Sequence, residues 1–165
     1  MEVEEAIIMM RYWIIPITYD NWLVCHSELV YGFGESLENL IKAGDTIIFY
    51  VMKSRCRDPK YASCLVGAYE VIGKWSREDK PLWPDEKEIG KVLYPYRIRL
   101  KLIKDGKVKV EELVGRLSFI KNKDGWQVYF RGCPTNFRRT IPERDAKLII
   151  SYMRVSEDES KGGQD

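Results

Sequence analysis

Aromatic side chains next to glycine or proline are the residues of this sequence best suited to ligand chemistry. Tyr31 and Phe33 flank Gly32, and Trp83 precedes Pro84 in a loop made rigid by two prolines. Because a nucleobase has two flat π faces, two rings can sandwich it, and each stacked base contributes about 1–3 kcal/mol to binding. A methyl group adds apolar area that a tight pocket rewards, and a flipped base exposes its hydrogen-bonding edge. These rings therefore predict an aromatic pocket for a base.

Further residues can complete such a pocket. Trp22 is a fourth ring, although its place on a predicted helix face is equally typical of a core residue. Asn21 and Ser118 carry donor and acceptor groups for a base edge, and Asn21 is also suited to capping a helix. Gly32 and Gly132 allow backbone amides to approach a ligand closely. The predicted base pocket comprises Asn21, Trp22, Tyr31, Gly32, Phe33, Trp83, Pro84 and Ser118.

Basic residues predict contacts with a phosphate backbone. Seven of the 25 acidic residues, but only one of the 27 basic residues, lie in the first ten or last ten positions, so the body between them carries a net charge of about +8. A body this basic concentrates polyanions near its surface, although a solvated surface without a partner explains the charge equally well. The predicted phosphate-binding residues are Arg55, Arg57, Arg131, Gly132, Arg138 and Arg139.

Catalytic chemistry has little support in the sequence. Cys25 and His26 are adjacent, but neighbouring helical residues point about 100° apart and do not form a nucleophile–base pair. The phosphate-binding patterns G-x-x-x-x-G-K-[ST] and G-x-G-x-x-G are absent from the sequence. Its four cysteines form no C-x-x-C pair and it has one histidine, so we predict reduced thiols, no metal site and no cofactor.

Short strands and helices must position these residues. The predicted strands are the apolar or alternating segments 12–17, 46–51, 63–72 and 96–103. Helices are predicted after the capping residues at 18–21, after Ser36, and from Pro142 over 143–153. Other segments are predicted as a loop at 31–34, a long connection at 74–91, a turn at 104–107, and two apolar segments, 114–120 and 126–131, around a polar turn.

These elements favour one mixed α+β domain built on a twisted, barrel-like sheet, with no repeat and no βαβ alternation. A chain of 165 residues is long enough to bury its own core. The apolar stretch at 6–17 is interrupted by Arg11 and Pro16, follows acidic rather than basic residues, and is shorter than the ~18 residues that cross a bilayer. We therefore expect a cytoplasmic protein with no membrane contact and a disordered acidic tail at 156–165.

Short stretches along the chain resemble, in order, the EVE domain family. They are Arg11–Ile14, Asn21–Trp22, Val30–Phe33, Lys42–Asp45, Leu82–Asp85, Tyr94–Arg97, Leu117–Ile120, Tyr129–Gly132 and Ile141–Pro142. The resemblance implies a PUA-like twisted β-barrel of about five to six strands with flanking short helices over residues 10–155. It also makes residues 1–9 an N-terminal extension, with Met10 a candidate start.

The family is similar in fold to PUA and YTH domains, which bind RNA or a methylated base. The resemblance places Tyr31 and Trp83 where YTH domains have cage aromatics, and a tyrosine at position 31 leaves a smaller stacking face than tryptophan. It implies a module that recognises a modified, methylated base in RNA or DNA and is not an enzyme. The alternatives are a nuclease or RNA-modifying enzyme on a PUA/ASCH-like scaffold, and a protein-interaction module whose acidic tail after Ser156 docks a basic partner.

Overall fold

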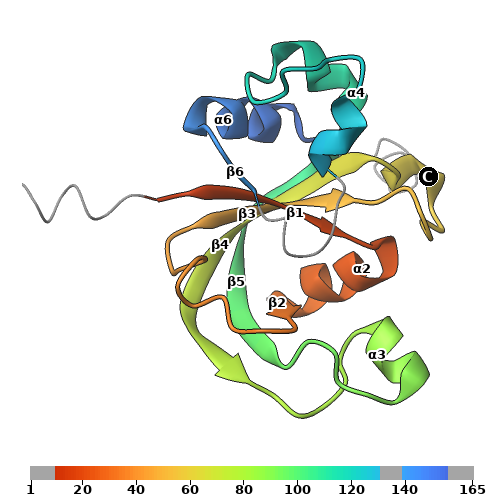
Figure 1. Ribbon diagram of the computed structural model, residues 1–165, viewed down its shortest axis with the longest axis vertical. Helices are drawn as coiled ribbons and strands as arrows, with labels where there is room; N and C mark the ends of the chain where they lie inside the picture. The colour runs from red at the N-terminus through yellow and green to blue at the C-terminus, as the bar shows by residue number, and fades with distance from the viewer. Residues whose placement is uncertain (1–9, 131–138, 156–165) are drawn as a thin grey trace, which may run out of the picture.

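The computed structural model describes residues 10–130 and 139–155, which form a curved mixed sheet with helices on both faces (Figure 1). The strands are β1 (Tyr12–Ile17), β2 (Val30–Phe33), β3 (Thr46–Val51), β4 (Cys64–Arg77), β5 (Tyr96–Lys109) and β6 (Arg139–Ile141). The helices are α2 (Tyr19–Glu28), α3 (Pro84–Ile89), α4 (Val110–Leu113) and α6 (Glu143–Tyr152), with 3-10 turns at Pro59–Tyr61, Val114–Arg116 and Trp126–Phe130.

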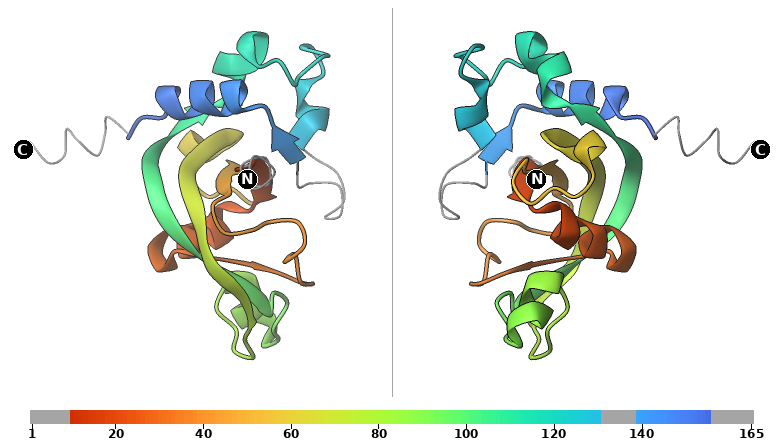
Figure 2. Two further views of the ribbon diagram at one scale, coloured as in Figure 1. Left: turned by 90° about the vertical axis from the view of Figure 1, so that its left-hand side faces the viewer. Right: turned by 90° about the vertical axis from the view of Figure 1, so that its right-hand side faces the viewer.

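The sheet has the strand order β2-β5-β4-β3-β1-β6. β1 and β3 run parallel in its interior, with Tyr12 opposite Thr46 and Ile17 opposite Val51, while the other pairs are antiparallel. Figure 2 shows the long strands β4 and β5 side by side and bent along their length, with α6 near one end and α3 near the other. α2 and α3, which carry many of the predicted site residues, thus lie away from α6.

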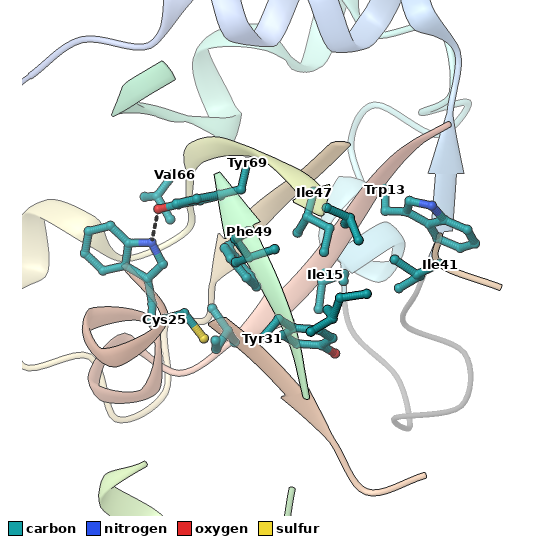
Figure 3. Close-up of a cluster of buried hydrophobic side chains, with 14 of the residues drawn as sticks. Trp13, Ile15, Cys25, Tyr31, Ile41, Ile47, Phe49, Val66 and Tyr69 are labelled. Atoms are coloured by element: carbon teal, nitrogen blue, oxygen red, sulfur yellow. Dashed lines mark hydrogen bonds between the residues drawn. The ribbon is translucent and has the colours of Figure 1, made fainter. Parts of the chain in front are cut away.

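Both faces of the sheet are covered by apolar side chains. On one face Trp13 and Ile15 of β1 pack with α2 and β2, in the cluster drawn in Figure 3. On the other face Ile14 packs with Ala146 and Ile149 of α6. Because successive strand residues point to opposite faces, a strand covered on both sides is a continuous apolar run, as β1 and β3 are.

Several elements predicted from apolar periodicity are confirmed. β1 and β3 have the predicted bounds, α2 begins after Thr18, whose side chain accepts a hydrogen bond from the Asn21 backbone (3.3 Å), and α6 follows Pro142. Within β4 a bulge is present at Gly67, since the register of β4 with both neighbours shifts there and Gly67 has a φ of +69°.

Other predictions were wrong where a glycine or an apolar run was ambiguous. Residues 31–33 are in strand β2 rather than a loop, 38–40 form a turn rather than a helix, and β5 continues through 104–107 to Lys109. The segments 114–120 and 126–131 contain 3-10 turns and no strand within the described residues. The connection 74–91 contains the end of β4 and helix α3.

The closed barrel is also corrected, because the sheet is open among the described residues, with β2 and β6 at its two edges. β2 has four residues and pairs with Tyr96–Arg99 of β5. β6 has three, and the registers of β1, β3 and β4 relate them to Lys101–Lys104 of β5. The two edge strands are short and lie opposite different parts of β5, so they cannot pair with each other to close a barrel.

Within the residues that the structure describes, no helix has the length and apolar character needed to cross a membrane. The predicted extension at 1–9 and the predicted acidic tail at 156–165 lie outside the described residues. The domain limits of 10 and 155 therefore stay predictions.

The bulge at Gly67 gives a test of the sheet. We expect Gly67→Ala to destabilise the protein by about 1–3 kcal/mol, because its Cβ would lie 2.5 Å from the Tyr69 hydroxyl and φ is +69°. Urea unfolding measures the change. Gly115→Ala is the matched control, since a Cβ there meets nothing within 4 Å. Equal stability of the two variants would contradict this account of the bulge.

Candidate functional site

A hollow of about 220 Å³ lies between α2, β2 and the segment of α3, and we call it the Trp83 hollow. This volume is below the roughly 300–1,000 Å³ of pockets for drug-sized ligands, and it suits a group the size of one base. The residues lining it are Pro16, Ile17, Thr18, Asn21, Cys25, Tyr31, Gly32, Phe33, Met52, Trp83, Asp85 and Tyr94.

The Trp83 ring forms a fixed wall of this hollow. It is 2% exposed, its Nε1 donates a hydrogen bond to the Cys25 Sγ (3.3 Å), and Tyr94 meets it edge-on with ring centroids 5.5 Å apart. Gly32 makes room for this ring, because a Cβ at position 32 would lie 2.4 Å from the Trp83 Cη2. The ring rather than a ligand therefore occupies the space beside Gly32.

A second ring, Tyr31, comes from β2 and is 5% exposed. Its neighbours are Phe49 and Trp75, with ring centroids 5.8 and 6.4 Å away, and Figure 3 shows it beside Cys25 at the edge of the core cluster. Phe33, two residues further along β2, is half-buried. Tyr31 and Phe33 both line the same hollow as Trp83.

The loop that carries Trp83 is held by the buried carboxylate of Glu86. This carboxylate accepts hydrogen bonds from the backbone N–H groups of Leu82 (2.7 Å), Trp83 (3.1 Å), Leu93 (2.9 Å) and Tyr94 (2.9 Å). Burial alone raises the pKa of the Glu86 carboxyl, but the four N–H donors outweigh it and leave the pKa below its ordinary value. Glu86 is therefore charged at neutral pH.

Arg97 completes this support from β5. Its side chain is 10% exposed, lies 3.7 Å from Glu86, and donates hydrogen bonds to the backbone carbonyls of Tyr94 (3.0 Å) and Lys80 (2.5 Å). Its guanidinium also lies 5.1 Å from the centroid of the Trp83 ring. Because these contacts use the guanidinium inside the fold, Arg97 belongs to the framework of the hollow.

Polar groups gather at one side of the Trp83 hollow. The Asp85 carboxylate accepts hydrogen bonds from the Asn21 amide (3.1 Å) and the Tyr94 hydroxyl (2.5 Å). Burial and the bond to Asp85 raise the pKa of the Tyr94 hydroxyl, so it remains a donor at neutral pH. Carboxylate and amide groups of this kind can read the N–H groups of a base edge.

A second, open hollow, the cation hollow, lies beside the first. Its lining residues are Asp20, Lys53, Arg55, Cys56, Arg57 and Glu88. Asp20 precedes Asn21 and Lys53 follows Met52, two residues of the Trp83 hollow. The Arg57 Nε donates to Asp20 (2.6 Å), while Lys53 and Arg55 are exposed. The predicted basic loop thus lies next to the predicted pocket.

The structure brings five of the eight predicted pocket residues together in the Trp83 hollow, namely Asn21, Tyr31, Gly32, Phe33 and Trp83. The other three lie elsewhere. Pro84 is exposed at the start of α3, and Ser118 donates to the buried Asp145 carboxylate of α6 (2.8 Å). Trp22 lines a different hollow beyond α2, and its Nε1 donates to the Tyr69 hydroxyl (3.1 Å).

Of the predicted phosphate-binding residues, Arg55 and Arg57 line the cation hollow. Arg139 is the first residue of β6, on the opposite side of the sheet order from β2. Arg131, Gly132 and Arg138 lie outside the described residues.

Sequence reasoning missed Glu86, Tyr94 and Cys25 as parts of the site. The available signal for Glu86 was its place three residues after Trp83 at a helix start, where an acidic side chain bonds the capping backbone N–H. Burial raises the pKa of the Cys25 thiol to about 12, so this thiol is protonated and unreactive. His26 turns to the Tyr69 hydroxyl instead (2.8 Å), as expected if the adjacent pair does not act together.

Comparison with known families gives a match to the EVE domain over residues 11–152. A UPF0310 protein of Saccharolobus solfataricus is 34% identical over 147 residues, covering 89% of this chain and 97% of that protein. A UPF0310 protein of Pyrococcus horikoshii is 35% identical over 152 residues, covering 85% of this chain and 97% of that protein.

Solved structures with a similar fold are YTH domains. The YTH domain of the Zygosaccharomyces rouxii MRB1 protein, in complex with N6-methyladenosine RNA, has a TM-score of 0.56 at 15% identity and covers 90% of each chain. The Mmi1 YTH domain in complex with RNA has a TM-score of 0.56 at 15% identity, covering 87% of this chain and 79% of that one. At identities this low, the structural similarity establishes a shared fold and nothing further.

The Glu86 carboxylate gives a test of the framework. We expect Glu86→Gln to cost about 1–3 kcal/mol of stability at pH 7, because an amide cannot accept from all four backbone donors and carries no charge to pair with Arg97. Since the folded-state pKa lies below the ordinary 4.5, this contribution is complete above about pH 4.5 and is lost as the pH falls through the folded-state pKa.

Denaturant unfolding of wild type and variant between pH 7 and pH 3 measures the difference. The matched control is Glu88→Gln, an exposed position on the same helix, which we expect to change stability by less than about 0.5 kcal/mol. A difference between wild type and Glu86→Gln that stays constant down to pH 3 would show that the charge of Glu86 is not what holds the loop.

Proposed function

The chain belongs to the EVE domain family, and from this premise we propose that it is an RNA-binding module that accommodates a methylated base in the Trp83 hollow. One observation carries the proposal. Three aromatic residues, Tyr31, Phe33 and Trp83, are among those that line a single small hollow, and an open hollow with three cations lies directly beside it. The YTH domains of similar fold that are solved with RNA support RNA as the partner.

The shape of the Trp83 hollow suits a base that has left its strand. The Trp83 ring is fixed by Gly32, Cys25 and Tyr94, so binding needs little reordering of this wall. Phe33 and Tyr94 are half-buried residues that line the hollow. A methyl group on the base adds contact with these apolar walls, and this contact favours the methylated base over the plain one.

The polar groups of the hollow read the edge of that base. Asp85 and Asn21 are hydrogen-bonded to each other and line the hollow together. A carboxylate accepts from the amino group or ring N–H of a base, and an amide side chain can bond both types of group. A base that offers no donor cannot form this bond with Asp85, which keeps its bonds to Asn21 and Tyr94, and such a base therefore binds less tightly.

Affinity comes largely from the phosphates next to the base. Lys53 and Arg55 are exposed in the cation hollow, while Arg57 is already paired with Asp20. Arg55 has a φ of +58°, a conformation that non-glycine residues rarely adopt and that is enriched at functional sites. These cations give the module sequence-independent, salt-dependent binding, to which the Trp83 hollow adds the preference for a methylated base.

The base-binding role of Trp83 is tested with matched oligonucleotides. We expect Trp83→Leu to abolish the preference for RNA with N6-methyladenosine or methylated cytosine over plain RNA, while weak, salt-dependent binding remains. Fluorescence anisotropy measures both affinities. Since Trp83 is buried, Phe33→Leu serves as a second variant that keeps the wall, and its preference should fall about 5-fold or more.

Trp126→Leu is the control, because this half-buried ring packs against Phe130 on the α6 side of the sheet. Thermal melting verifies that each variant is folded. If folded Trp83→Leu and Phe33→Leu both keep the wild-type preference, the base does not enter the Trp83 hollow. If the wild type binds the matched DNA strand better than RNA, the proposal is wrong about RNA as the partner, while base binding in the Trp83 hollow still stands.

The cation hollow makes a separate prediction about salt. We expect the double variant Lys53→Ala and Arg55→Ala to bind methylated and plain RNA more weakly by the same factor. The slope of log K against log salt should become shallower by about 1.4, or about 0.7 for each phosphate contact. Anisotropy at several salt concentrations measures the slope. The pair Arg144→Ala and Lys147→Ala removes two exposed cations of α6 and should leave it unchanged. An unchanged slope in the first pair would place the phosphates elsewhere.

A further inference from the structure

A third hollow, of about 290 Å³, lies on the other side of α2 from the Trp83 hollow, and we call it the ring hollow. Tyr19, Trp22 and Tyr61 line it and contact one another, with ring centroids of Tyr61 5.3 Å from those of both Tyr19 and Trp22. Two cations, Lys107 and Arg154, also line it. A cluster of rings bordered by cations is the composition that binds a stacked base and its phosphate.

The three hollows meet at the start of α2. Thr18 lines the Trp83 hollow, Asp20 lines the cation hollow, and Tyr19 between them lines the ring hollow. The loop after β3 makes the same connection, since Arg57 lines the cation hollow and the next residue, Asp58, lines the ring hollow. Arg57 also joins the two directly, with its guanidinium 5.4 Å from the Tyr19 ring centroid.

The order of these hollows is that of the groups along a nucleic acid strand, in which a phosphate lies between one base and the next. A pocket for one base is followed by a hollow with cations and then by a second set of rings. We propose that the ring hollow binds the base next to the one held in the Trp83 hollow, so that the module binds a single-stranded segment with two bases on opposite sides of the start of α2. This inference rests on the proposed function for the identity of the first base.

The charges of the ring hollow fit a nucleotide. The two carboxylates are engaged by the fold, because Asp58 accepts from the Lys60 backbone (3.1 Å) and Asp105 from the Gly106 backbone (2.8 Å). Within residues 10–130 and 139–155, by contrast, Arg154 makes hydrogen bonds only through its main chain, to Lys107. Its guanidinium is thus available to a phosphate.

Lys107 supplies a movable second cation. Its Nζ lies 5.3 Å from the centroid of the Tyr61 ring, the position that a stacked base would take. A lysine side chain is flexible, so an arriving base displaces the ammonium group, which then pairs with the adjacent phosphate. The same ring therefore holds a cation when RNA is absent and a base when RNA is bound.

The experiment measures coupling between Tyr61 and the neighbouring base. Labelled RNA pentanucleotides carry the methylated base at the centre and either a base or an abasic site at each neighbouring position. We expect Tyr61→Leu to lower the affinity for the complete pentanucleotide by about 5- to 150-fold, which is the loss of one stacked base. With the abasic site at the neighbouring position that the ring hollow holds, the variant and the wild type should bind equally.

Tyr152→Leu is the matched control, since Tyr152 is also half-buried with a cation, the Arg116 guanidinium, 4.9 Å from its ring centroid. It should change neither affinity. A Tyr61→Leu loss that is the same with and without each neighbouring base overturns the inference, because the effect is then structural. No loss on the complete strand also overturns it.

The same series separates this inference from the proposed function. If wild type binds methylated and plain centres equally, base reading in the Trp83 hollow fails. Coupling of Tyr61 to a neighbouring base on the plain strand would then still support the ring hollow as a base site. Preference for the methylated centre without such coupling would uphold the proposed function and overturn the second base site.

Discussion

Backbone N–H groups from two separate turns of the chain donate hydrogen bonds to one buried carboxylate, that of Glu86, and the geometry of the site depends on these bonds. Turns that carry rings have no sheet to order them, and their unpaired N–H groups are costly to bury. A charged acceptor satisfies several donors at once and fixes their relative positions. Asp45 and Asp145 also accept three hydrogen bonds each, all of them from distant residues for Asp145 and two of them for Asp45. Buried acids thus order this fold where the sheet does not reach.

The parts of the fold that could be predicted are those where the signal lies within a few consecutive residues. The buried strands at 12–17 and 46–51 are continuous apolar runs, and α2 and α6 have local capping signals. The errors have a common cause, since long-range pairing overrides local chemistry. Gly32 is typical of a loop, but in the fold it lies in β2 and leaves space for the Trp83 ring. Asp105–Gly106 is typical of a turn, but in the fold it lies within β5, where Arg154 pairs with that strand.

The same limit applies to the site. Rings beside glycine and proline could be predicted, and five predicted residues share one hollow. The hollow that Trp22 lines could not be predicted, because adjacent residues of α2 face different hollows and the sequence does not show which face meets β2. Tyr94 and Glu86 were missed because their roles depend on hydrogen bonds across a loop, from the Tyr94 backbone N–H to Glu86 and from the Tyr94 hydroxyl to Asp85. Periodicity carries no information on such bonds.

The position of β6 has a consequence for synthesis of the chain on the ribosome. Among the described strands, β6 pairs with β1 alone, joining Arg139–Ile141 to Tyr12–Ile14, so the first of these strands to emerge receives its second neighbour from the last. Until then the apolar β1 presents unpaired N–H and C=O groups along one edge, a template for pairing with other nascent chains. A truncated product that ends before Arg139 keeps that edge permanently, so translational arrest yields an aggregation-prone fragment although most of the sheet is present.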